Sequence, residues 1–158
     1  MQCHTWFSRA RVKLFHIYFV LKRPMTLGVR ALVLNETEGS VFLVRHTYVP
    51  GWYLPGGGVE RGETMMQALV KELREEGKIE LTGEAELFGI YHNSRASVRD
   101  HVALYVVRQF AQTAPRLPDK EIAECGFFPL DAMPEGTTQS TRRRIAEVLE
   151  EGEVEEVW

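Results

Sequence analysis

Hydrophobic and polar residues follow one another in short runs, and these runs predict a sheet of strands with helices between them. The β-branched run Met25–Leu34 predicts a buried strand, and Ser40–His46, beyond a polar turn, predicts its hairpin partner. Similar runs predict further strands at Trp52–Leu54, Ile79–Leu81, Glu86–His92, Asp100–Phe110 and around Gly126–Phe128. The polar segments between them, Asn93–Arg99 and Ala111–Lys120, predict loops.

Two segments carry the repeat of an amphipathic helix. The first begins at Thr64, which forms a capping box with Gln67, and runs to about Glu76, with Gly77 as its stop. The second covers Thr138–Glu151. We expect the apolar face of the first helix to consist of Met66, Leu69, Val70 and Leu73.

Length and composition indicate one ordinary globular domain. The chain has 158 residues and a net charge of −3, which does not suggest a binder of long nucleic acid. Its two cysteines, Cys3 and Cys125, have no disulfide spacing, so we expect a reducing, cytoplasmic location and a packing role for Cys125.

The N-terminal segment, residues 1–24, differs from the rest because it is basic and contains no acid. Its apolar stretch Leu14–Leu21 is too short to span a bilayer and lacks a cleavage site, so we expect neither a signal peptide nor a transmembrane segment. A basic amphipathic helix over residues 8–22 fits better. It would pack on the domain or on a partner subunit, as in a homodimer; the alternative is a membrane surface.

The most informative residues are three glutamates at the end of the first helix. Glu72, Glu75 and Glu76 are three and four residues apart, which places their carboxylates on one helical face. Such a face is often just solvated, but crowded anions repel one another, and Mg²⁺ prefers oxygen ligands of this kind. The preceding glycines, Gly56–Gly58, permit close approach of the backbone to a ligand.

The segment Gly57–Ile79 resembles the Nudix box of the Nudix (MutT-like) hydrolase family. That box reads Gly, five residues, Glu, seven residues, then Arg-Glu-apolar-x-Glu-Glu-x-Gly-apolar. The residues that match in register are Gly57, Glu63, Glu72, Leu73, Glu75, Glu76 and Ile79. The resemblance implies that residues 25–158 form an α/β domain, an α/β/α sandwich with a mixed β-sheet between the box helix and the C-terminal helix.

The resemblance also implies a function and a set of site residues. It implies a hydrolase of phosphoric anhydride bonds that uses Mg²⁺, or Mn²⁺, to cleave the diphosphate of a nucleoside diphosphate linked to another group. Glu72 would be a metal ligand or the general base, and Lys71 would orient a neighbouring glutamate. The expected metal ligands are Gly57, Glu63, Glu72, Glu75 and Glu76.

Two positions depart from the family pattern. Lys71 replaces the family arginine and loses its bidentate fork, although it could simply pair with Glu75. Lys78 replaces the family glycine, with Gly77 one place earlier, so either the helix ends sooner or Lys78 adopts a strained conformation.

Other residues are candidates for the rest of the site. A further ligand or base would come from Glu121 or Glu124, between which the sequence does not choose. The candidates for substrate binding are Arg45, Trp52, Arg95 and Arg99. Trp52 could stack on a base or pack in the core, and the two loop arginines could clamp phosphate or be solvated.

Three hypotheses about function follow. The first is a Mg²⁺-dependent pyrophosphohydrolase, with ADP-ribose or a nucleotide sugar preferred as substrate. The second is a Nudix-like domain that binds a nucleotide without cleaving it, motivated by Lys71 and Lys78. The third makes the basic N-terminal segment a membrane or partner-docking module.

Overall fold

The computed structural model describes residues 12, 15, 18, 19, 21, 22, 24–150 and 155–158. The elements in chain order are β1 (Thr26–Asn35), β2 (Ser40–His46), α2 (Met65–Gly77), β3 (Ile79–Leu81), β4 (Glu86–His92), β5 (Asp100–Val107), β6 (Phe110–Gln112), β7 (Ile122–Pro129) and α3 (Gln139–Glu150).

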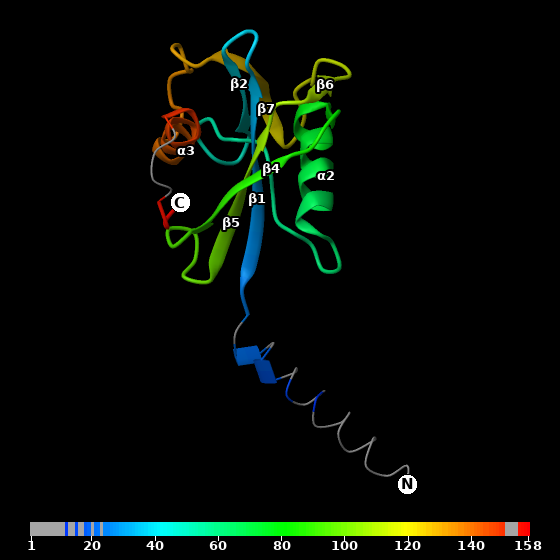
Figure 1. Ribbon diagram of the computed structural model, residues 1–158, viewed down its shortest axis with the longest axis vertical. Helices are drawn as coiled ribbons and strands as arrows, with labels where there is room; N and C mark the ends of the chain where they lie inside the picture. The colour runs from blue at the N-terminus through cyan, green and yellow to red at the C-terminus, as the bar shows by residue number, and fades with distance from the viewer. Residues whose placement is uncertain (1–11, 13–14, 16–17, 20, 23, 151–154) are drawn as a thin grey trace.

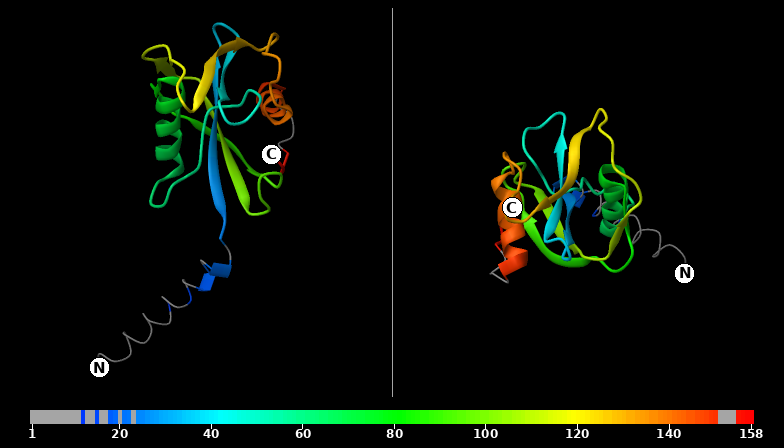
Figure 2. Two further views of the ribbon diagram at one scale, coloured as in Figure 1. Left: turned by 180° about the vertical axis from the view of Figure 1, so that it is seen from behind. Right: turned by 90° about the horizontal axis from the view of Figure 1, so that it is seen from above.

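A mixed five-stranded sheet forms the centre of the domain, in the order β4-β5-β1-β2-β7. The central pair β1 and β5 is parallel, and the other neighbours are antiparallel, including the predicted hairpin of β1 and β2. Helix α2 covers one face and α3 the other (Figures 1 and 2). The α/β/α sandwich implied by the resemblance is therefore confirmed.

Alternate residues of the inner strands pack against different helices. In β1, Val29, Ala31 and Val33 join the cluster beneath α2, while Leu32 and Leu34 join the cluster beneath α3. Since successive side chains of a strand point to opposite faces, a strand with a helix on each side is apolar throughout. This explains why β1 reads as an almost continuous hydrophobic run.

Helix α2 begins as predicted but faces the core differently. Thr64 caps it, and the capping box with Gln67 is complete. Met66, however, is 38% exposed, so its assignment to the apolar face is wrong. The helix is rotated so that one carboxylate faces inward, which a hydrophobicity pattern does not anticipate. Its buried residues are Ala68, Leu69, Leu73, Glu76 and Gly77.

The end of α2 resolves the question left open by the sequence. The helix runs through Gly77, and Lys78 closes it in the left-handed conformation, with φ of 54°. A Cβ on Gly77 would lie about 3.0 Å from the Phe42 ring and 2.9 Å from Ile79 Cδ1. A side chain at position 77 would therefore crowd Phe42 and Ile79, and the left-handed turn falls on Lys78.

Several strand boundaries differ from the predictions. The run Asp100–Phe110 is not one strand, because β5 ends at Val107 and Phe110 begins β6, which pairs with β3. Trp52–Leu54 forms only isolated bridges, Tyr53 with Val44 and Trp52 with Thr137. These segments join different layers, and such pairings depend on tertiary contacts rather than on local pattern.

The described residues before β1 are helical at positions 12, 15, 18, 19, 21 and 22. The exposed large hydrophobic side chains among them include Val12, Phe15, Tyr18 and Leu21. The remainder of the predicted helix over 8–22 lies outside the described residues, as do Cys3 and Glu151. No helix in the described part of the chain is long and apolar enough to cross a membrane.

Candidate active site

The loop Leu54–Gly58 is fastened along β1. The backbone N–H of Val29 donates to Gly57 O at 2.9 Å, and the Arg30 guanidinium donates to Leu54 O at 2.9 Å and to Gly56 O at 2.6 Å. Gly56 has φ of 140°, and a Cβ there would lie 2.1 Å from Val29 O. Only glycine lets the loop approach the strand this closely.

Glu76 lies under this loop and is buried, with 5% of its surface exposed. The Gly56 N–H donates to Glu76 Oε2 at 2.7 Å, and His46 Nε2 lies 3.6 Å from Oε1. Burial raises the pKa of the Glu76 carboxyl to about 7; the Gly56 bond and Arg30 oppose this shift, and the charge of Glu72 adds to it. Burial also lowers the pKa of His46. The carboxylate is therefore held in place but incompletely compensated.

Glu72 lies beside Glu76 and against the glycine loop. A Cβ on Gly57 would come within 2.6 Å of Glu72 Oε1, so the backbone at this position must be bare. Burial raises the pKa of Glu72, Lys71 opposes the rise, and Glu75 adds to it. Glu75 itself is exposed. The three predicted glutamates therefore form a gradient from buried to solvent-facing along one end of α2.

Lys71 holds two of the predicted carboxylates together. Its Nζ lies 3.3 Å from Glu63 Oε1 and 3.8 Å from Glu72 Oε1. Glu63 also accepts a hydrogen bond from the Glu60 N–H at 2.9 Å, which lowers the pKa of Glu63. The lysine therefore contacts Glu63 and Glu72 rather than forming only the pair with Glu75 that was its alternative.

Glu121 approaches the same cluster from the start of β7. Asp119 Oδ1 accepts the N–H groups of Glu121 at 2.9 Å and Ile122 at 2.8 Å, which fixes this turn. The charge of Glu121 contributes to raising the pKa of both Glu72 and Glu76. Of the two later glutamates left open by the sequence, Glu121 is therefore electrostatically coupled to the cluster.

Glu124 and two predicted substrate residues have other partners. Glu124 pairs with Arg45 at 2.7 Å, with both side chains about half exposed. Trp52 is only 6% exposed and packs edge-on against Phe128, with ring centroids 4.7 Å apart. Trp52 thus belongs to the core beneath α3, which was the alternative to base stacking.

A pocket of about 500 Å³ lies on the α3 side of the loop. Arg95 lines it, as do Arg30, Val49, Tyr53, Leu54, Asn93, Ala96, Thr138, Ser140, Thr141 and Trp158. Arg99 is not among the lining residues. Arg30 joins this pocket to the carboxylates, because it holds the carbonyl of Gly56, whose N–H holds Glu76. Sequence reasoning missed Arg30; its signal was a charge inside an apolar strand.

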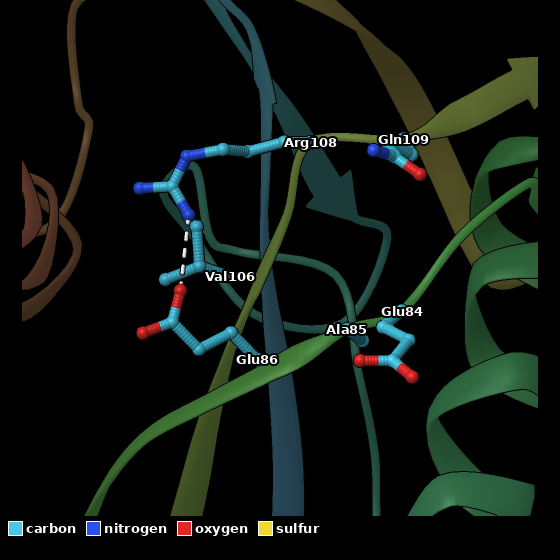
Figure 3. Close-up of a pocket in the computed structure, with 6 residues that line it drawn as sticks. All are labelled: Glu84, Ala85, Glu86, Val106, Arg108 and Gln109. Carbon is cyan, nitrogen blue, oxygen red and sulfur yellow. Dashed lines mark hydrogen bonds and ion pairs between the residues drawn. The ribbon is translucent and has the colours of Figure 1, made fainter.

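A second pocket, of about 570 Å³, is lined by residues around the start of β4 and the end of β5, including Glu84, Glu86 and Arg108 (Figure 3). Arg108 pairs with Glu86 at 3.3 Å and with Glu36 at 2.9 Å. The second pocket shares no lining residue with the first pocket, and none of the motif residues lines it. Although larger, this second pocket is not the place where the chemically distinctive groups meet.

Comparison with known proteins agrees with this geometry. A sequence model of the NUDIX domain family matches residues 24–149. The chain belongs to this family. The matched region contains every strand and all but the last residue of α3, so the NUDIX fold accounts for the whole sandwich.

Relatives of the NUDIX chain carry different names. A Bacillus subtilis protein provisionally named 8-oxo-dGTP diphosphatase is 35% identical over 49% of this chain. An RNA pyrophosphohydrolase of Gluconobacter oxydans is 40% identical over 34% of this chain. The matches span half of the first relative and 34% of the second. The crystal structure of a Burkholderia pseudomallei MutT NUDIX hydrolase is 26% identical, covers 78% of this chain and 97% of that one, and has a TM-score of 0.66.

The NUDIX family implies a divalent metal ion, and the donors on α2 suit one chemically. All the candidate side-chain ligands are carboxylate oxygens, which Mg²⁺ and Mn²⁺ prefer. Among the residues that the structure describes, no group of three His, Cys, Asp or Glu side chains is arranged to hold a metal alone. Mg²⁺ commonly binds one or two carboxylates together with water and substrate phosphates. Glu72, Glu75 and Glu76 would hold it, with Glu63 and the Gly57 carbonyl nearby.

Proposed function

We propose that this protein is a Mg²⁺-dependent pyrophosphohydrolase that cleaves the diphosphate of a nucleoside diphosphate linked to another group. The observation that carries the proposal is the buried Glu76, held by the Gly56 N–H beside Glu72. Burial of an incompletely paired carboxylate disfavours its charged form, and a bound cation would compensate that cost. A role limited to the stability of the fold would not require this arrangement.

Each side chain has a role in this proposal. The metal, when bound, would neutralise phosphate charge and activate water. Glu72, Glu75 and Glu76 would hold it, and we assign Glu121 or Glu72 as the base that would take the proton from the attacking water, which the charge effect of Glu121 on Glu72 supports. Lys71 orients Glu63 and Glu72. Arg30 and Arg95 line the adjacent pocket, where they attract the anionic substrate.

A pocket that Arg30 connects to the carboxylates supports the proposed substrate class. It combines two arginines with aromatic and hydroxyl groups, which suits a nucleoside attached to phosphate. The names of the relatives include an 8-oxo-dGTP diphosphatase and an RNA pyrophosphohydrolase, so they do not choose among substrates. We retain ADP-ribose or a nucleotide sugar as the preferred substrate, and the net charge of −3 argues only against long RNA.

A substrate panel tests the proposal. The purified protein is incubated with Mg²⁺ or Mn²⁺ and with ADP-ribose, nucleotide sugars, 8-oxo-dGTP, dinucleoside polyphosphates and 5′-triphosphate RNA, and the products are identified. We expect metal-dependent release of a nucleoside monophosphate. The variant Glu75→Gln should lose about 100-fold or more in kcat, because it removes a metal ligand.

The matched control is Glu84→Gln, an exposed glutamate in the second pocket, which should retain normal turnover. Normal turnover of Glu75→Gln would contradict the assigned site. Ligand-induced thermal stabilisation of the wild type without any product would favour the nucleotide-binding alternative instead.

A further inference from the structure

A short segment near the C-terminus, Glu155–Trp158, forms one side of the pocket next to α3. It lies beyond residues 24–149, the part of the chain that matches the NUDIX family. The N–H of His92 donates to Glu156 O at 2.8 Å, and the N–H of Trp158 donates to His92 O at 3.1 Å. These bonds extend the edge of the sheet at the end of β4 and bring Trp158 to the pocket.

Two arginines of α3 fasten this segment. Arg144 is fully buried, and its guanidinium lies 2.7 Å from Glu147 and 3.1 Å from Glu155. Arg143 pairs with Glu155 at 3.0 Å and donates to Trp158 O at 3.3 Å. Detaching the segment would remove these contacts and leave the buried Arg144 guanidinium with Glu147 as its remaining carboxylate partner. The segment is therefore a fixed wall of the pocket.

The indole of Trp158 is supported from inside the domain. Its ring packs edge-on against Tyr91, with centroids 5.5 Å apart, and the Arg144 guanidinium lies 5.7 Å from its centroid. Trp158 is nevertheless only partly buried. A large aromatic surface is thus held in position at the pocket while part of it stays accessible to a ligand.

The groups around Trp158 indicate what that ligand is. The pocket is also lined by Ser140, Tyr53, Arg30 and Arg95. Aromatic surface suits a planar heterocycle, and arginine suits an attached phosphate. Because Arg30 also holds the loop above Glu76, the phosphate end of such a ligand would face the carboxylates.

We propose that Trp158 is a specificity-determining residue that stacks on the nucleobase of the substrate. The identity of the ligand as a nucleotide rests on the proposed function. Trp158 would contribute to binding and would not touch the reacting atoms. The residue lies outside residues 24–149, the part of the chain that the family model matches.

Metal-free binding of nucleoside monophosphates tests this directly. Titration calorimetry would compare AMP, GMP, CMP and UMP with ribose 5-phosphate, which has no base, for wild type, Trp158→Ala, Trp158→Phe and Val157→Ala. We expect at least one nucleotide to bind more tightly than ribose 5-phosphate. Trp158→Ala should weaken that nucleotide by about tenfold, and Trp158→Phe should restore most of the affinity.

The controls separate base recognition from damage to the wall. The Val157 side chain is 43% exposed, and only the backbone of this residue pairs with His92. Val157→Ala should therefore bind nucleotides like wild type. Ribose 5-phosphate should bind wild type and Trp158→Ala equally. With a turned-over substrate, Trp158→Ala should raise KM and leave kcat unchanged.

Equal nucleotide affinity of wild type and Trp158→Ala would overturn the proposal, as would equal weakening of nucleotide and ribose 5-phosphate. The binding assay needs neither metal nor turnover. Base-selective binding lost in Trp158→Ala, without hydrolysis of any substrate, would therefore refute the proposed function alone. Hydrolysis without that loss would refute the role of Trp158 alone.

Discussion

The two faces of the sheet bury ionisable groups in opposite ways. Beneath α2, Glu76 has one backbone hydrogen bond and His46 at 3.6 Å, and burial raises the pKa of Glu76 to about 7. Beneath α3, Arg144 is fully buried but has two carboxylates within 3.1 Å and the Tyr91 ring 4.2 Å from its guanidinium. One face leaves a charge undercompensated, while the other surrounds a charge with partners.

This difference separates a face that is suited to binding a cation from a face whose charges stabilise the fold. An undercompensated carboxylate is available to a cation, and it lowers the stability of the metal-free fold. A well-paired arginine stabilises the contact between α3 and residues 155–158 and leaves little for a ligand to gain. The strained Lys78 also lies at the end of α2, so the unfavourable features gather beside the candidate active site.

The largest expected effect on stability comes from removing the paired charge of Arg144. Arg144→Leu should lower the free energy of unfolding by about 3–5 kcal/mol, because it leaves the nearly buried carboxylate of Glu147 without its ion-pair partner, whereas the half-exposed Glu155 keeps Arg143. Urea denaturation measures this. Arg61, an exposed arginine in the loop before α2, provides the control, since Arg61→Leu should change stability by less than about 0.5 kcal/mol. Equal effects of the two substitutions would remove the distinction between the faces.

A smaller effect, of opposite sign, is expected at Glu76. Its folded-state pKa is raised from 4.5 to about 7, so the folded protein retains a proton that the unfolded chain releases over this range. The contribution of Glu76 to stability is therefore present below about pH 4.5 and is lost as the pH rises towards 7. In metal-free protein near pH 8, Glu76→Gln should be more stable than wild type by about 2–3 kcal/mol.

Denaturation in EDTA across this pH range would test the effect of Glu76. The advantage of the glutamine variant should vanish towards about pH 4.5, where both side chains are neutral. Added Mg²⁺ should stabilise wild type near pH 8 and the variant much less, because a ligand is missing. An advantage that does not change with pH would show that the charge of Glu76 is well compensated.

The smallest expected effect is at the end of α2. Lys78→Gly should raise the free energy of unfolding by about 1 kcal/mol, because glycine adopts the left-handed conformation without steric cost. The reciprocal change Gly77→Ala should destabilise, since its Cβ would contact Phe42 and Ile79. Thermal denaturation of both variants would show whether packing explains why the glycine stands at position 77 rather than at position 78. Stabilisation by Gly77→Ala would contradict that explanation.

The sequence alone predicted most of the strands and the start of α2, because hydrophobic runs and a capping box are local signals. It misplaced Met66 because the buried position on α2 is occupied by the carboxylate of Glu76. It offered Trp52 as a stacking residue, whereas Trp52 is packed in the core and Trp158 lines the pocket. Aromatic residues look alike in a sequence, and only their neighbours decide whether a ring faces a ligand.

The carboxylate chemistry was determined by one contiguous segment, because helical spacing alone brings Glu72, Glu75 and Glu76 onto one face. The pocket was decided by the tertiary structure. Arg30, Asn93–Ala96, Thr138–Thr141 and Trp158 are distant in the chain and meet only when the sheet and α3 have formed. A motif within one helix can therefore be identified from its spacing, whereas a specificity pocket depends on long-range contacts that no local pattern encodes.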